Sequence, residues 1–241
     1  IIYAHKKIGN RKKILRSLKI WKVVFLLVFF LWWDARKWNY INGFTQKRKS
    51  ERQKIRAFWL TKQFLNLGSA FIKLGQLLSA RPDILPGGWI VELEGLQDKV
   101  PPFEFEKVES ILKSELKLNF KKIKNIVRTP LGAASIAQVH LAKLDNGKDV
   151  VFKIQRPGLE KLFRLDLEVM QQVAALVQRN QAWSYGRDWI GIAKECKRVL
   201  LRELDFGIEA QYAARFKQQF LDDPNVKIPS VNWKLCTKKV L

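Results

Sequence analysis

The stretch PLGAASIAQVHLAKLDNGKDVVFKIQRPG, residues 130–158, decides the fold of this chain. It starts with small residues and continues as a strand-like segment over 136–144. It then turns at Asp145-Asn146-Gly147 and runs on as a second strand over 149–155. The second strand carries one lysine, Lys153, among apolar neighbours. Small residues let backbone N–H groups approach phosphate oxygens, and a lysine on the next strand supplies the opposite charge. The stretch therefore predicts a nucleotide-binding hairpin.

Each part of this hairpin also has a plainer interpretation. Lys153 alternates with Phe152 and Ile154, so it could be an ordinary lysine on a solvated strand face. The tetrapeptide Gly132-Ala133-Ala134-Ser135 says little by itself. Before a strand, a turn and a lysine it predicts a loop that covers phosphates, stiffer than a glycine-rich one because alanine disfavours left-handed backbone angles. Neither a GxxxxGK[ST] nor a GxGxxG motif occurs. The combination favours the functional interpretation.

The formal charge of +23 is concentrated near the start of the chain. Residues 1–66 hold 17 Lys and Arg against two acids, Asp34 and Glu51, whereas the other 175 residues hold 28 basic and 20 acidic groups. Basic residues beside an apolar stretch are attracted to anionic lipid by about 1 kcal/mol each, although nucleic acid would attract them too. The two cysteines are 40 residues apart without a CxxC motif, which predicts neither a disulfide scaffold nor a metal site.

The only long apolar run is IWKVVFLLVFFLWW, residues 20–33. Its 14 residues include a lysine and fall short of the ~20 that a spanning helix needs. An interfacial helix, a re-entrant segment and a helix buried in protein all remain open. Tryptophans at its ends resemble interfacial anchors, and no small-residue cleavage site supports a signal peptide. We therefore expect membrane association on the cytosol-facing side.

The pattern divides the chain into three parts. Residues 1–50 form a basic arm with the apolar segment, 51–122 a helical extension, and 123–241 an α+β unit. Apolar periodicity predicts one helix over 51–79, short ones over 86–97 and 104–117, and longer ones over 158–179 and 188–220. The tail, VKIPSVNWKLCTKKVL, is predicted to form two short strands.

Two further groups of charged residues lie outside the hairpin. Lys73 and Gln76 are three positions apart on an apolar helix, which alone would indicate a polar helix edge. Glu203, Asp205 and Glu209 surround an Asp-Phe-Gly tripeptide. We reject the metal-binding role of that tripeptide in protein kinases, since no His-x-Asp loop precedes it and only 52 residues separate it from Lys153.

Taken together, these residues resemble the UbiB/AarF family of atypical protein-kinase-like proteins, which are linked to ubiquinone and other prenylquinones. The resemblance covers residues from about 58 to the end. It rests on the motif KxGQ at 73–76, the alanine-rich loop, the strand lysine, and ExD at 203–205 followed by Glu209. The strings SARPD (79–83), LQD (96–98), ASIAQV (134–139) and KIQRPG (153–158) agree with it. The N-terminal segment looks closest to cyanobacterial or plastid members.

The resemblance implies an α+β fold, a protein-kinase-like N-lobe preceded by an all-helical extension, and ATP as the nucleotide. Lys153 would contact the ATP phosphates and pair with Glu209, while Gly132, Ala133, Ala134 and Ser135 would cover the nucleotide. The family usually has alanine at the position of Gly132, which implies a slightly looser cover.

The resemblance also assigns the second group of residues. Lys73 would pair with Glu203 and Asp205, docking the helical extension across the site, and Gln76 would help to shape this lid. Such a lid occupies the substrate groove, so ATPase activity is more plausible than ordinary protein phosphorylation.

A family member should also carry a C-lobe with a His-x-Asp catalytic loop, an Asn for a metal ion and a true Asp-Phe-Gly, none of which occurs here. We therefore expect no catalytic residue in this chain, Mg²⁺ only with a C-lobe, and negligible phosphoryl transfer by these 241 residues alone. The leading hypothesis is an ATP-binding, membrane-associated kinase-like protein of prenylquinone synthesis or its regulation. It would contact anionic lipid and prenylquinone-pathway lipids or proteins in a bacterial, cyanobacterial or plastid compartment. A non-catalytic membrane adaptor is the alternative, and a nucleic-acid-binding protein is a weaker one.

Overall fold

The computed structural model of the chain describes residues 2–96, 100–184 and 186–241. It contains two compact units. Unit 1 comprises residues 1–97 and 161–198, and unit 2 comprises residues 98–160 and 199–241. The segment 161–198 thus groups with the N-terminal helices, although it follows the predicted hairpin in sequence. The three-part division at residues 50 and 122 remains a prediction.

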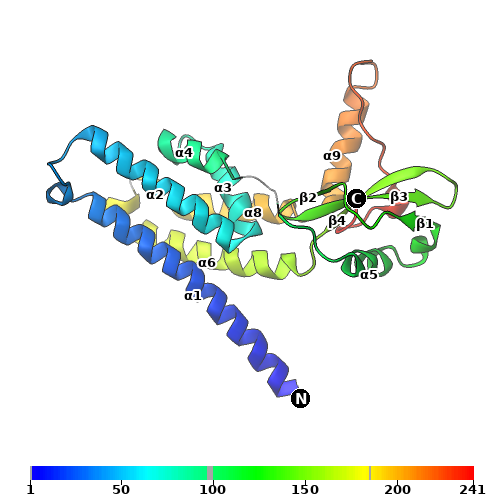
Figure 1. The fold of residues 1–241 in the computed structure, drawn as a ribbon, viewed down its shortest axis with the longest axis horizontal. Helices are drawn as coiled ribbons and strands as arrows, with labels where there is room; N and C mark the ends of the chain where they lie inside the picture. The colour runs from blue at the N-terminus through cyan, green and yellow to red at the C-terminus, as the bar shows by residue number, and fades with distance from the viewer. Residues whose placement is uncertain (1, 97–99, 185) are drawn as a thin grey trace. The chain divides into compact units, whose positions relative to one another are not determined.

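Among its described residues, the secondary structure of unit 1 is all helical and includes a short 3-10 helix, Lys37–Asn39 (Figure 1). Its longest elements, α1 (Ile2–Asp34) and α2 (Gln46–Leu67), form a hairpin. The short helices α3 (Ser69–Ser79) and α4 (Gly87–Glu94) pack on α2. The remaining helices are α6 (Leu159–Arg179), α7 (Gln181–Ser184) and most of α8 (Trp189–Arg202).

The single helix expected over 51–79 is in fact two helices. Gly68 separates α2 from α3 with a φ of +85°, a backbone angle that costs a side-chain-bearing residue energy. Its N–H donates to the carbonyls of Phe64 and Leu65, which ends α2. The apolar period continues across this break, so periodicity alone could not show it.

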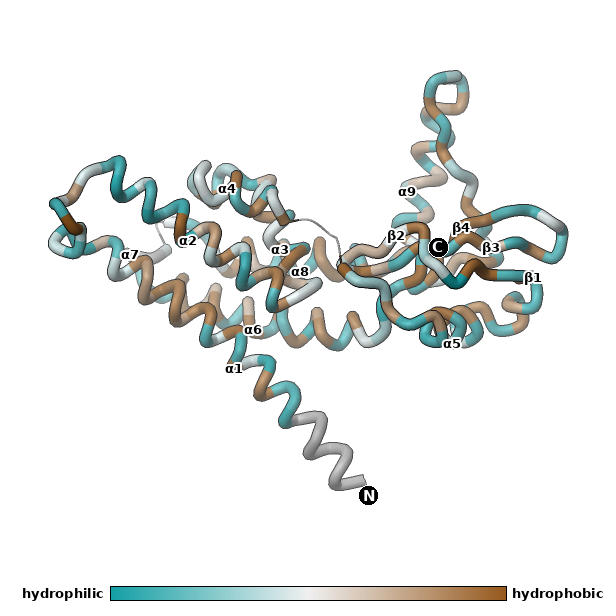
Figure 2. Tube along the Cα trace, viewed as in Figure 1, coloured by the Kyte–Doolittle hydropathy of each residue, from teal (hydrophilic) through white to brown (hydrophobic). Residues whose placement is uncertain are grey.

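The apolar run 20–33 forms the second half of α1. None of the described helices combines the length and hydropathy needed to cross a bilayer. Figure 2 shows the hydrophobic residues of α1 concentrated in this half. Ile20 is buried, whereas Phe25 and Phe29 on another side of the helix are exposed.

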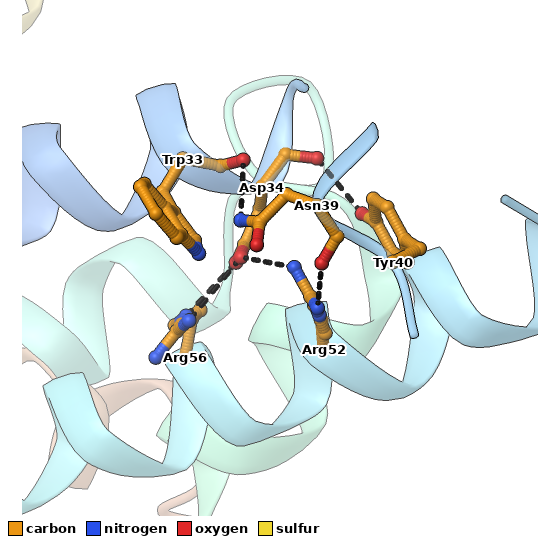
Figure 3. A network of polar contacts seen from close by, with 6 residues as sticks. All are labelled: Trp33, Asp34, Asn39, Tyr40, Arg52 and Arg56. Atoms are coloured by element: carbon orange, nitrogen blue, oxygen red, sulfur yellow. Dashed lines mark hydrogen bonds and ion pairs between the residues drawn. The ribbon is translucent and has the colours of Figure 1, made fainter. Parts of the chain in front are cut away.

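The α1–α2 turn is fixed by a polar network (Figure 3). Arg56 and Arg52 both bind the Asp34 carboxylate, with closest N–O distances of 2.8 and 3.3 Å. Tyr40 donates its hydroxyl to the Asp34 carbonyl, and Asn39 donates its amide to the Trp33 carbonyl. Two carbonyls that the end of α1 leaves without helical partners are thereby satisfied.

A second ion pair ties three helices of unit 1 together. Arg16 on α1 binds both oxygens of the buried Asp166 on α6, at 2.8 and 2.6 Å. The same guanidinium donates to the Leu67 carbonyl at the end of α2. Burial raises the pKa of the Asp166 carboxyl, and the bonds from Arg16 oppose that shift. The carboxylate is therefore stable in this position only with its partner.

We expect Arg16→Leu to lower the free energy of unfolding by about 3–5 kcal/mol, since it leaves a buried carboxylate unpaired. The double variant Arg16→Leu/Asp166→Leu should recover at least half of that loss. Urea unfolding followed by circular dichroism measures both. Equal stability of the single variant and the unaltered chain would contradict this account of the pair.

Unit 2 is built on a small antiparallel sheet. β1 (Ile123–Ile126), β2 (Gly132–Ala133) and β4 (Asp149–Gln155) all pair with β3 (Ala137–Leu144). The β3–β4 hairpin turns where the sequence predicted, with Gly147 at a φ of +81°. A mixed α+β fold with a helical N-terminal part is therefore confirmed.

The core of unit 2 lies between one face of this sheet and α5 (Phe105–Leu116), with the tail completing it. Alternate residues of β4, Phe152 and Ile154, are buried there against Leu112 of α5 and Val240 of the tail. Lys153 consequently points to the opposite face of the sheet. The core of unit 2 thus determines which way the candidate lysine faces.

The tail departs from prediction. The two expected strands are absent, and the chain forms a 3-10 helix at Trp233–Leu235. Only an isolated bridge joins Val240 to Ile154. Leu241 exchanges two backbone hydrogen bonds with Lys153, of 2.7 and 3.0 Å. Pro229 lacks an N–H and the flanking residues are exposed, so little favours a strand at the start of the tail.

Candidate nucleotide-binding site

The candidate site centres on an ion pair within unit 2. The Lys153 ammonium on β4 donates to both carboxylate oxygens of Glu209, at 2.5 and 2.7 Å. Glu209 lies in the first turn of α9 (Phe206–Gln219). The ammonium also lies 4.9 Å from the centre of the Phe206 ring. The two side chains remain 30% and 45% exposed, so a ligand could reach both charges. The expected ion pair is present, while its role in nucleotide binding remains a prediction.

Asp205 determines where α9 begins. Its backbone is extended, and its carboxylate accepts the Gly207 N–H at 3.0 Å, which is the geometry of an N-cap. The single helix expected over 188–220 is therefore wrong: α8 ends at Arg202 and α9 starts at Phe206. An aspartate prefers capping a helix to lying within one, because its side chain competes for backbone N–H groups. Asp-Phe-Gly thus acts here as a helix start.

The sheet and the tail each hold the start of α9 in place through one contact. Gln155 at the end of β4 donates its side-chain amide to the Leu204 carbonyl at 2.7 Å. The Phe206 N–H donates to the Lys238 carbonyl of the tail at 3.0 Å. Leu204 and Phe206 are themselves buried. Glu209, one turn later, is thereby positioned for Lys153.

The alanine-rich segment is half strand and half turn. Gly132 and Ala133 form β2 and pair with Val139 and Gln138, so the expectation of a loop is wrong for these two residues. The turn follows at Ala134 and Ser135, where the Ala134 N–H donates to the Ala137 carbonyl at 2.8 Å. None of the four residues has a positive φ, so the expected stiffening by alanines in a left-handed conformation does not apply.

Arg156 connects this turn to the chain that enters the unit. Its side chain donates to the carbonyls of Ala134, at 2.8 Å, and Pro101, at 2.8 Å. The guanidinium also lies 5.6 Å from the centre of the Phe103 ring. Burial lowers the pKa of Arg156, although arginine remains protonated in proteins. In the sequence Arg156 stands out only as part of the string KIQRPG. Its position just after the strand lysine gave no sign of this contact.

We expect Arg156→Lys to loosen the turn, because a lysine cannot reproduce the planar fork that reaches two carbonyls. Amide hydrogen exchange at residues 133–136 should become about tenfold faster, which corresponds to about 1.4 kcal/mol. Lys148→Arg, a change on the exposed β3–β4 turn, serves as the control. Unchanged exchange in Arg156→Lys would show that the arginine does not hold the turn.

A buried polar pair on β3 was also missed. Gln138 pairs its side-chain amide with both backbone groups of Phe103, at 2.9 and 3.2 Å. It lies 2.8 Å from Nε2 of the fully buried His140, whose Nδ1 lies 2.8 Å from the Val127 carbonyl. Because the Gln138 amide nitrogen donates to Nε2, the proton of a neutral ring is on Nδ1. Gln138 and Arg156 thus both anchor the segment around Phe103.

Glu115 on α5 secures the tail beside Lys153. Lys239 donates to one oxygen of Glu115 at 2.8 Å and Thr237 to the other at 3.0 Å. Burial raises the pKa of Glu115, but the hydrogen bonds from Lys239 and Thr237 outweigh it, so the net pKa lies below the ordinary value. The carboxylate therefore stabilises the fold when it is ionised.

A pH titration tests this contact. A carboxyl with a lowered folded pKa stabilises above its unfolded value, about 4.3, and loses that contribution as the pH falls through the folded pKa. Glu115→Gln should therefore be less stable than the unaltered chain at pH 7, with the difference shrinking below pH ~4. Urea midpoints from pH 7 to 3 provide the measurement, and Glu109→Gln on the same helix is the control. A difference that does not vary with pH would contradict the assignment.

Lys73 and Gln76 lie on α3, within unit 1. Gly75 between them allows close packing, because a Cβ there would lie 2.2 Å from Leu96 Cδ1 and 3.0 Å from Phe64 Cδ2. Gln76 donates its side-chain amide to the Leu96 carbonyl at 3.1 Å. Glu203 and Asp205, the expected partners of Lys73, belong to unit 2, so that pairing stays a prediction.

The part of the chain that the structure describes contains no candidate metal site. Over residues 2–96, 100–184 and 186–241, no group of three or more His, Cys, Asp or Glu side chains could hold an ion. The Lys153 ammonium is a cationic donor, which could bind a phosphate oxygen but not a bare cation.

Comparison with known proteins places this geometry in context. Residues 95–241 match the family model described as the ABC1 atypical kinase-like domain. The uncharacterized protein sll1770 of Synechocystis is 39% identical over 97% of the chain. ACTIVITY OF BC1 COMPLEX KINASE 7 of Arabidopsis thaliana, a chloroplastic protein, is 40% identical over 96%. A probable protein kinase UbiB of Marinobacter nauticus is 36% identical over 73%.

The chain spans less than half of these relatives. It covers 40% of the Synechocystis protein, 33% of the Arabidopsis protein and 32% of the Marinobacter protein. Among solved structures, Rv3197 from Mycobacterium tuberculosis, determined in complex with erythromycin, matches 80% of this chain and 49% of its own, with a TM-score of 0.53 and 28% identity. The kinase-like fold and the family resemblance predicted from the sequence are confirmed.

Proposed function

Because the chain belongs to the ABC1 atypical kinase-like family, we propose that it forms the ATP-binding part of an atypical kinase or ATPase. The observation that supports this most directly is the bidentate pair between Lys153 and Glu209. A lysine held by a helix carboxylate is the arrangement that positions nucleotide phosphates in protein kinases.

The surroundings of the pair support phosphate binding. Lys153 lies opposite Val139 on β3, and the turn at Ala134 and Ser135 directly precedes that strand. Arg156 holds the turn through the Ala134 carbonyl. The ammonium on β4 and the small residues of β2 and the turn therefore flank the same strand, β3. Backbone N–H groups of small residues can approach phosphate oxygens closely.

The remaining parts of the proposal extend beyond this site. Mg²⁺ would accompany ATP and would be held by groups outside these residues. The link to prenylquinone lipids follows from the resemblance of the sequence motifs to the UbiB/AarF family. The chloroplastic and bacterial relatives favour a plastid or bacterial compartment, and the basic N-terminal helices favour anionic membrane lipid as a partner.

Binding of a fluorescent ATP analogue to the chain tests the central claim. Lys153→Met should weaken binding at least tenfold, because it removes the phosphate counter-charge while preserving the length of the side chain. Lys143→Met is the matched control, since Lys143 is an exposed lysine on the neighbouring strand β3. Equal affinity of Lys153→Met and the unaltered chain, or no binding by the unaltered chain at millimolar nucleotide, would refute the proposal.

A further inference from the structure

One face of α1 presents a row of apolar side chains to solvent, interrupted by the exposed Lys22. We call this row the outer stripe. Its members follow one another at steps of three, four or seven residues and so share a helix face. They are Leu15 (59% exposed), Leu18 (58%), Phe25 (66%), Phe29 (49%) and Trp32 (48%). Because a helix rises 1.5 Å per residue, the stripe is about 25 Å long. Exposed apolar groups gathered on one face over this length mark an interaction site.

The opposite face of α1 is already occupied. Ile20 is 1% exposed, and Arg16 is bound to Asp166. Phe30 packs edge-on against Trp59 of α2, at 5.1 Å between ring centres. These contacts hold one side of α1 against the rest of unit 1. The helix therefore has one free apolar face, and leaving unit 1 to cross a bilayer would break the buried ion pair.

The α1–α2 turn adds exposed apolar groups to the end of the stripe. Trp38 is 72% exposed and Ile41 is 83% exposed. Trp38 packs against Trp33, at 5.6 Å between ring centres, and the network around Asp34 fixes the backbone on either side (Figure 3). Solvent-exposed groups on a rigid turn bind with less entropy loss than the same groups on a flexible loop.

The charges beside the outer stripe indicate what kind of partner it contacts. Exposed basic residues flank it or interrupt it: Lys12, Lys13, Lys19, Lys22, Arg36 and Lys37. Of the two acids in residues 1–66, Asp34 is bound to Arg52 and Arg56, which leaves Glu51 alone at the surface. A second copy of the same face would bring these like charges together. The headgroups of an anionic bilayer would neutralise them, and the acyl region would cover the apolar groups.

We propose that α1 lies in the plane of an anionic membrane interface, with the outer stripe facing the acyl chains and the α1–α2 turn inserted at its end. This inference deepens the proposed membrane association and rests on it. Among the orientations that the sequence left open it selects the in-plane one, because crossing a bilayer would break the buried pair of Arg16 and Asp166. Tryptophans at the interface and basic residues at the headgroups match the chemistry of each layer.

Vesicle flotation tests which face binds. The chain should float with vesicles that contain 30% phosphatidylglycerol and much less with pure phosphatidylcholine vesicles. Phe25→Glu/Phe29→Glu should lose at least tenfold in the bound fraction. The control Leu118→Glu/Leu221→Glu alters two leucines of unit 2 that are 81% and 70% exposed and should bind normally. Equal losses in both double variants, or equal flotation of Phe25→Glu/Phe29→Glu and the unaltered chain, would overturn the assignment.

A depth measurement tests the in-plane orientation directly. Single cysteines at positions 18, 25 and 32, in a background with Cys196 and Cys236 replaced by serine, would carry an environment-sensitive fluorophore. Quenching by lipids brominated at different depths should place all three labels at the same shallow level. A depth that changes steadily from position 18 to position 32 would indicate a crossing helix and would refute the proposal.

Measuring ATP binding and lipid binding on the same variants distinguishes failure of the membrane inference from failure of the proposed nucleotide site. ATP-analogue affinity should be the same in Phe25→Glu/Phe29→Glu as in the unaltered chain, because the stripe belongs to unit 1 and the site to unit 2. Absence of lipid binding with normal ATP binding would refute the membrane inference alone. Dimers in sedimentation that are lost in the stripe variant, without lipid binding, would assign the stripe to a second copy instead.

Discussion

The ion pair between Lys153 and Glu209 is the constraint around which unit 2 is arranged. The apolar core fixes the direction of Lys153, because Phe152 and Ile154 on either side are buried on the other sheet face. Asp205 fixes where α9 begins and hence where Glu209 lies. A shift of one residue in the β3–β4 register would turn the lysine into the core. The site is therefore a product of strand register and one helix cap.

The sequence predicted the parts of this site that are encoded locally. Alternation of side chains on β4 and the Asp145-Asn146-Gly147 turn gave the hairpin, because both depend only on neighbouring residues. The role of Arg156 depends on where residues 100–103 return, and that of Glu115 on where the tail lies. Such contacts join residues that are 55 and more than 120 positions apart, so no local pattern reports them.

The errors share a physical cause. Periodicity continued across Gly68 and across residues 203–205, so two pairs of helices were each predicted as one. In both places a backbone preference overrides the apolar pattern: a positive φ at glycine and N-capping at aspartate. The tail strands failed for the opposite reason, since the strand-like composition there meets the sheet only through an isolated bridge to β4. Family membership adds the kinase-like fold, which none of these local signals establishes.

The backbone bonds between Leu241 and Lys153 have an additional consequence. β4 borders the sheet, and an uncovered border strand offers a row of N–H and C=O groups to any extended peptide. At the lysine itself those groups are already satisfied by the tail. The tail therefore occupies the backbone N–H and C=O of Lys153, so another chain cannot pair with β4 at this residue. At Lys153 the side chain alone remains available for recognition.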